Sequence, residues 1–97
     1  MADALPAGAR LVASAAAVRD AWDRLAAGVQ SCVDREPCVL LGVLLGGMVP
    51  LVNIASRIRG DFLLDYCHLT RYRGELRGGR LEWLQRPHCE MRERTVV

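Results

Sequence analysis

The sequence predicts an α/β fold built on a parallel sheet. This prediction rests on three features that follow one another along the chain. A segment with helical periodicity comes first, a continuous apolar run follows, and a second amphipathic segment starts after a pair of glycines. An apolar run without alternation is typical of a strand in a parallel sheet, which is buried on both faces. We expect one domain over residues 1–97, since no internal repeat and no linker divides the chain.

The first helix is expected over residues 14–33. Val18, Trp22 and Leu25 recur there at helical spacing, with charged residues between them, and Ser14 suits the N-cap position. The later elements follow from apolar runs and breakers: a strand over 38–45, a helix over 48–58, a strand over 61–72, a hairpin over 70–85 and the start of another strand over 94–97. A strand that begins so near the last residue indicates an incomplete domain.

Composition excludes several classes of function. The net charge of +2 is too small and too dispersed to indicate nucleic-acid binding, and all thirteen basic residues are arginine. The four cysteines follow no C-x-x-C spacing, and the N-terminus lacks the features of a secretory signal, so we expect reduced thiols and a cytoplasmic protein. Residues 37–56 carry no charge and are long enough to span a bilayer, but Gly46, Gly47 and Pro50 interrupt them. No membrane association is expected.

Some polar and aromatic residues receive only structural interpretations. Adjacent residues of a strand point to opposite faces, so neither Cys67 with His68 nor the pair at 88–89 is expected to bind a metal. Asp61 and Asp65 are expected at strand ends, where they serve solubility or local hydrogen bonding. Trp22 is expected in the core, and the second tryptophan, Trp83, in cross-strand packing.

The turn at Gly46 and Gly47 is the motif that indicates chemistry. Glycines between a strand and a helix let the backbone approach a ligand closely and adopt dihedral angles closed to other residues. Together with the helix dipole, the amide groups of such a turn form an anion site suited to phosphate or pyrophosphate. A tight strand–helix connection without any ligand is the alternative. The chain contains neither the dinucleotide fingerprint nor a P-loop.

Three segments, 42–47, 70–74 and 94–97, match in order and spacing the N-terminal half of the hypoxanthine-guanine branch of the type I phosphoribosyltransferases. The chain resembles this branch of the family. The resemblance implies a Rossmann-like parallel sheet with a flexible hairpin lid, truncated here in its central sheet. It implies that Leu45, Gly46 and Gly47 bind pyrophosphate through backbone amides, beside a cis peptide bond after Leu44. Leucine stands at 45, where many members have lysine.

The same resemblance implies that Arg71 and Tyr72 begin the catalytic lid, which closes over the substrate and excludes water. The implied activity is purine salvage: transfer of a phosphoribosyl group from phosphoribosyl pyrophosphate to hypoxanthine or guanine, with Mg²⁺ as cofactor in a homo-oligomer. The acid-base aspartate, the purine pocket and the metal ligand would belong to segments that this chain does not contain. We therefore expect no catalytic and no metal-binding residue here, and an inactive chain on its own. A non-catalytic regulator or RNA-binding module of the same fold, and an adaptor that needs a partner, are the alternatives.

Overall fold

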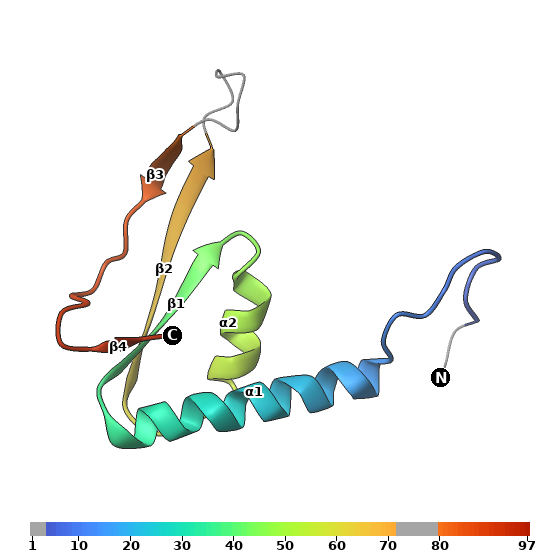
Figure 1. The fold of residues 1–97 in the computed structure, drawn as a ribbon, viewed down its shortest axis with the longest axis horizontal. Helices are drawn as coiled ribbons and strands as arrows, with labels where there is room; N and C mark the ends of the chain where they lie inside the picture. Colours follow the sequence, from blue (N-terminus) through green and yellow to red (C-terminus); the bar gives the residue numbers. More distant parts are fainter. Residues whose placement is uncertain (1–3, 72–79) are drawn as a thin grey trace.

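The computed structural model describes residues 4–71 and 80–97, which form two helices and a four-stranded sheet. In chain order the elements are α1 (Ala15–Arg35), β1 (Cys38–Leu44), α2 (Met48–Ala55), β2 (Phe62–Arg71), β3 (Leu81–Gln85) and β4 (Thr95–Val96) (Figure 1). This order confirms the α/β architecture expected from the sequence.

The sheet has the strand order β3-β2-β1-β4. Strand β1 pairs in parallel with β2 over its whole length, from Cys38 opposite Phe62 to Leu44 opposite His68, and β4 is parallel to β1 on its other side. Only β3 runs antiparallel, beside the distal part of β2. The predicted parallel sheet is therefore correct, with one antiparallel arm attached.

Helix α1 begins where the sequence predicts. The side chain of Ser14 accepts a hydrogen bond from the backbone N–H of Ala17 at 3.0 Å, so Ser14 is the N-cap. The helix ends two residues later than expected, at Arg35, where the N–H of Glu36 donates to the carbonyl of Cys32 at 3.1 Å.

Helix α2 ends earlier than the sequence predicts, at Ala55 rather than at residue 58. The N–H of Arg57 donates to the carbonyl of Ile54 at 3.0 Å, which closes the helix with a tighter turn. Ile58 then leaves the helix and is buried in the core, 8% exposed. The helical spacing of apolar residues continues to Ile58 because this side chain is buried, although the residue itself is no longer helical.

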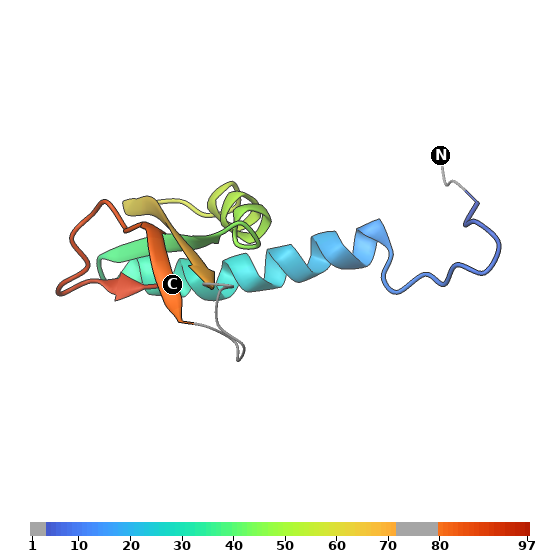
Figure 2. The ribbon, with the colours of Figure 1, turned by 90° about the horizontal axis from the view of Figure 1, so that it is seen from above.

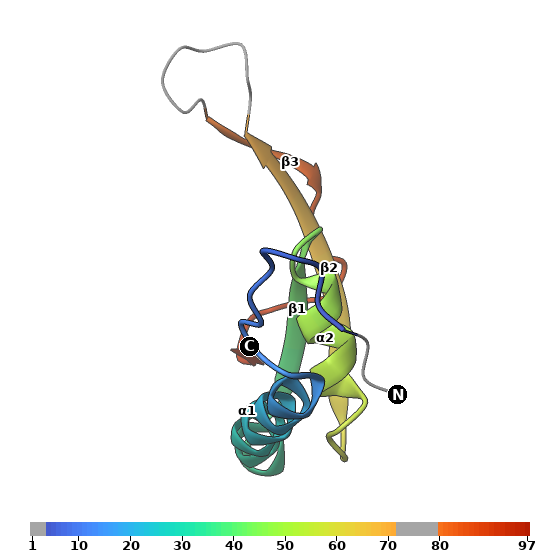
Figure 3. The same ribbon diagram turned by 90° about the vertical axis from the view of Figure 1, so that its right-hand side faces the viewer.

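The core is small and the chain is extended. Buried Ala26, Leu40 and Ile58 form its centre, and partly buried residues of α1, α2 and β2 pack around them. The radius of gyration is 17.5 Å, whereas a compact domain of about 100 residues has about 13 Å. Three parts of the chain project from the core: residues 4–14, the N-terminal part of α1, which runs past α2, and the arm of β2 and β3 (Figures 1 to 3).

The projecting part of α1 leaves its apolar stripe uncovered. Val18 is 41% and Leu25 is 55% exposed, while Val29 and Val33 on the same helix face pack against the core. Trp22 is half-buried rather than a core residue. The expectation that Trp22 lies in the core is therefore wrong, because neither α2 nor the sheet extends over the first half of α1 (Figure 2).

The uncharged run 37–56 does not form one helix. It is divided among β1, a turn and α2, and within the part of the chain that the structure describes no helix is both long and apolar enough to cross a membrane.

Candidate functional site

Residues 45–47 connect the carboxyl end of β1 to the N-terminus of α2 (Figure 1). In open α/β sheets, ligands bind outside the carboxyl ends of the parallel strands. The side chain of Leu45 is directed largely into solvent, with 67% exposure. The peptide bond between Leu44 and Leu45 is cis, as the family resemblance implies.

Some backbone N–H groups at this turn donate hydrogen bonds within the fold, and others remain available to solvent or a ligand. The N–H of Gly47 donates to the carbonyl of Val43 at 2.7 Å, and the N–H of Met48 donates to the carbonyl of Leu45 at 3.1 Å. Among residues 4–71 and 80–97, no backbone acceptor is found for the N–H of Gly46 or of Val49. An anion at the turn would therefore meet the amide of Gly46 and the positive end of the α2 dipole, while the amide of Gly47 is engaged.

The two glycines of the turn differ in whether the fold requires them, and the reason differs from the one that the sequence suggested. Neither has a positive φ, so the expected need for dihedral angles closed to other residues is wrong here. A Cβ on Gly47 would lie 2.6 Å from the nitrogen and 2.7 Å from the oxygen of Val43, so a side chain there would displace the backbone of β1. A Cβ on Gly46 would meet nothing within 4 Å. Packing requires Gly47, whereas Gly46 leaves open space at the turn.

His68 lies beside the turn, and the sequence interpretation assigned it no ligand-binding role. It is the register partner of Leu44, the last residue of β1. Residue 42, two positions earlier on β1, faces α2, since a Cβ on Gly42 would lie 2.9 Å from Cδ2 of Leu51. Side chains alternate along strands and partners in a parallel pair share a face, so His68 and Thr70 lie on the face that α2 covers. A histidine near the end of a strand was the available signal.

The proposed lid residues fall at the limit of the described structure. Arg71 is the last residue of β2 and is exposed, and alternation places its side chain on the sheet face opposite to His68. Tyr72 lies outside the described residues. The structure therefore brings the turn 45–47 and the end of β2 to one edge of the sheet and does not test the lid itself.

An apolar groove of about 300 Å³ adjoins the turn on the side of β4. Its lining includes Leu41, Val43, Leu51, Ile54 and Val97, so it offers almost no polar contact. Such a surface suits further hydrophobic chain rather than a phosphate group. A phosphate group at this edge of the sheet would therefore find polar partners at the turn and at the end of β2 rather than in the groove.

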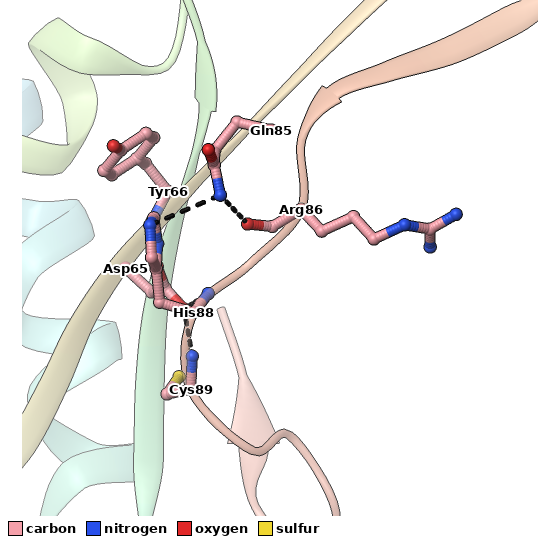
Figure 4. A network of polar contacts seen from close by, with 6 residues as sticks. All are labelled: Asp65, Tyr66, Gln85, Arg86, His88 and Cys89. Carbon is pink, nitrogen blue, oxygen red and sulfur yellow. Dashed lines mark hydrogen bonds and ion pairs between the residues drawn. The ribbon is translucent and has the colours of Figure 1, made fainter.

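A second polar site lies on β2, where Asp65 is buried with 5% exposure and is not at a strand end as expected (Figure 4). Its Oδ2 accepts from the backbone N–H groups of His88 at 2.6 Å and Cys89 at 2.7 Å, and its Oδ1 accepts from the N–H of Tyr66 at 2.7 Å. The Nδ1 of His88 lies 3.0 Å from the same Oδ1. We call Asp65, His88 and Cys89 the Asp65 clamp, because these bonds fasten the segment after β3 to β2.

The clamp strongly favours the ionised form of Asp65. Burial on its own would raise the pKa of this carboxyl, but the hydrogen bonds from Cys89, His88 and Tyr66 outweigh burial and hold the pKa well below the usual range of an aspartate. Burial, followed by the hydrogen bond to Asp65, raises the pKa of the Cys89 thiol. The clamp is thus built for a fixed charge and a neutral thiol, which suits a structural role.

No group of three or more histidine, cysteine, aspartate or glutamate side chains in residues 4–71 and 80–97 is arranged to hold a metal ion. All four cysteines are free thiols. Cys67 and Cys38 are each 2% exposed and lie on β2 and β1 within the sheet.

Comparisons with known proteins agree with this architecture at the level of fold. No family model and no curated protein matches the sequence, but 39 chains of solved structures match the fold. One is a hypoxanthine-guanine phosphoribosyltransferase from Bacillus anthracis, with 18% identity, a TM-score of 0.67, and 81% of this chain and 44% of that chain covered. Another is a hypoxanthine phosphoribosyltransferase from Staphylococcus aureus, with 18% identity, a TM-score of 0.71 and the same coverage.

A purine phosphoribosyltransferase from Pyrococcus horikoshii also matches, with 24% identity, a TM-score of 0.65, and 87% of this chain and 52% of that chain covered. The chain therefore has the α/β fold of the phosphoribosyltransferases. The chain spans about half the length of each of these three solved structures.

Proposed function

We propose that this chain provides the pyrophosphate-binding turn and the lid-bearing strand of a phosphoribosyltransferase for 6-oxopurines. The observation that carries the proposal is the turn 45–47 at the N-terminus of α2, on the carboxyl edge of a sheet with this fold, where the Gly46 amide has no backbone acceptor in the described part of the chain. Backbone amides at a helix N-terminus bind phosphate groups without a charged side chain, so Leu45 in place of a lysine does not prevent binding.

The substrates in this proposal are phosphoribosyl pyrophosphate and hypoxanthine or guanine, and the reaction would serve purine salvage. The turn would hold the pyrophosphate end of the substrate, since the Gly46 amide and the dipole of α2 both favour negative charge there. Arg71 and Tyr72 would begin the lid, which limits hydrolysis by excluding water from the reacting ribosyl carbon.

The remaining parts of the reaction do not fall on this chain. Mg²⁺ is expected as the cofactor of the complete enzyme, where it would neutralise charge on the pyrophosphate oxygens. The described residues do not fit a metal site, since they include no suitable group of ligands, and no step is assigned to a metal here. A complete enzyme of this kind would assemble as a homo-oligomer, with the acid-base residue and the purine pocket outside these 97 residues.

Calorimetric titration of the 97-residue chain with phosphoribosyl pyrophosphate, pyrophosphate and sulfate tests the proposal. We expect both pyrophosphate-containing ligands to bind and sulfate to bind more weakly, because sulfate fills only one of two phosphate positions. An assay for conversion of hypoxanthine to its nucleotide should show no activity for the chain alone. Absence of binding by both pyrophosphate ligands would contradict the proposal. Salt-sensitive RNA binding in its place would favour the non-catalytic regulator, since phosphate contacts weaken steeply with salt.

A further inference from the structure

We propose that His68 is a ligand-binding residue of the turn, whose imidazole contacts the bound pyrophosphate from β2. The inference rests on the proposed function and adds to it a side chain that neither the turn motif nor the fold comparison identifies. It explains how a turn without a charged side chain of its own can hold a strongly charged ligand.

The position of His68 follows from the strand register. His68 pairs with Leu44, so it lies level with the residue that immediately precedes the turn. It also lies on the sheet face that α2 covers, as the close approach of Gly42 to Leu51 shows. The N-terminus of α2 begins four residues after Leu44, above the same face. The imidazole and the positive end of the helix dipole are thus on one side of the sheet, at one edge.

The charge distribution around the turn explains why a contact from His68 would strengthen the binding of an anion. Residues 37–56 carry no charge at all, so β1, the turn and α2 together offer an anion only backbone dipoles. On the adjoining part of β2, the side chains that can carry positive charge are His68 and Arg71. Arg71 lies three residues further from the end of β1 and on the opposite sheet face. Of these two side chains, His68 is therefore the nearer to the end of β1, and it lies on the sheet face that α2 covers.

The two histidines of the chain differ in what they already bind. The ring of His88 lies 3.0 Å from Oδ1 of Asp65 and 3.3 Å from the amide nitrogen of Gln85, so it is engaged within the fold (Figure 4). No hydrogen bond or ion pair to the His68 ring is found in residues 4–71 and 80–97. His68 is half-buried, which limits its side-chain freedom while leaving it open to solvent.

Imidazole chemistry suits this task. A neutral ring donates one hydrogen bond and a protonated ring donates two, and each form can reach a phosphate oxygen. Pyrophosphate favours the protonated ring by its own charge, and charge-assisted hydrogen bonds are about twice as strong as neutral ones. The structure thus assigns pyrophosphate two kinds of donor: the Gly46 amide from the turn and the His68 ring from the neighbouring strand.

The test compares inorganic pyrophosphate binding by the full chain and three variants in low salt. His68→Leu removes the donor, and we expect it to weaken binding roughly tenfold, the equivalent of one charge-assisted hydrogen bond. His68→Lys keeps a cation at the position and should restore affinity to within about threefold of the parent chain. Arg19→Leu is the control: it makes a basic-to-leucine substitution on α1, and it should leave affinity unchanged within about twofold.

A second measurement separates contact from a merely structural role. On titration with pyrophosphate, the ring nitrogen resonances of His68 should shift in ¹⁵N spectra of the parent chain, while those of His88 stay in place. Parent-like affinity in His68→Leu, or an unmoved His68 ring, would overturn the inference and leave the proposed function standing. A parent chain that binds neither pyrophosphate nor phosphoribosyl pyrophosphate would overturn both.

Discussion

The turn 45–47 and the Asp65 clamp both fix irregular chain against the same sheet, but they do so by opposite means. The clamp uses a buried charge with four donors directed at it, and those described bonds leave its carboxylate fully engaged. The turn uses backbone hydrogen bonds and the close packing of Gly47 on Val43, and the Gly46 amide finds no backbone acceptor among the residues that the structure describes.

The difference separates a structural polar site from the site that we propose binds a ligand. A carboxylate that accepts several internal hydrogen bonds has nothing left for a ligand, whatever its charge. An exposed amide at a helix N-terminus, by contrast, has no partner within the helix and can still donate a hydrogen bond to a ligand. A strongly shifted pKa alone would have drawn attention to Asp65, yet the unengaged groups at the turn are the better evidence for ligand binding.

The largest expected effect is on the clamp. Asp65→Ala leaves the N–H groups of His88 and Cys89 without their acceptor, and we expect a loss of about 3 kcal/mol in the free energy of unfolding. Urea denaturation followed by circular dichroism measures it. Asp61→Ala, at an exposed position immediately before the start of β2, should change stability by less than about 0.5 kcal/mol. Equal effects of the two substitutions would show that the clamp is not formed in solution.

The pH dependence of stability provides the next test. The pKa of Asp65 is lower in the folded chain than in the unfolded chain, so its contribution is complete above the unfolded value of about 4 and is lost as the pH falls below it. We expect the melting temperature to fall more steeply between about pH 4 and pH 2 in the parent chain than in Asp65→Asn. Parallel curves for the two proteins would refute a depressed pKa at this site.

At the turn, the two glycines should respond differently to the same added methyl group. Gly47→Ala forces a Cβ against the backbone of Val43, and we expect a loss of roughly 2 kcal/mol. Gly46→Ala adds its Cβ to open space and should stay within about 0.5 kcal/mol of the parent chain. Thermal unfolding of both variants checks this, and a destabilisation of Gly46→Ala equal to that of Gly47→Ala would mean that the turn is packed differently.

The smallest expected effect concerns an exposed carboxylate that joins α1 to the segment after α2. Asp23 accepts from Nε of Arg57 at 2.9 Å, but its side chain is 67% exposed, against 3% for Asp65. Solvent screens such a pair, so Asp23→Asn should cost no more than about 0.5 kcal/mol. A cost approaching that of Asp65→Ala in the same denaturation experiment would show that burial does not set the ranking of these carboxylates.

The sequence predicted those features that depend on neighbours along the chain. The apolar run of β1 and the N-cap at Ser14 are local patterns, and both are confirmed. The role of Asp65 depends on backbone groups 23 and 24 residues away, which no local pattern reports. The requirement for Gly47 likewise depends on how the turn folds back over Val43. His68 was missed because only the strand register places it beside Leu44.

The β-bulge between His68 and Leu69 has a mechanical consequence for the edge where the turn lies. Strand β1 ends opposite His68, so beyond this residue the sheet narrows to the ribbon of β2 and β3 (Figure 3). A two-stranded ribbon twists and bends more easily than a wider sheet, and a bulge adds twist where it occurs. The arm therefore bends at the residue that flanks the turn. A displacement of the arm is transmitted to the turn, and a displacement of the turn is transmitted to the arm.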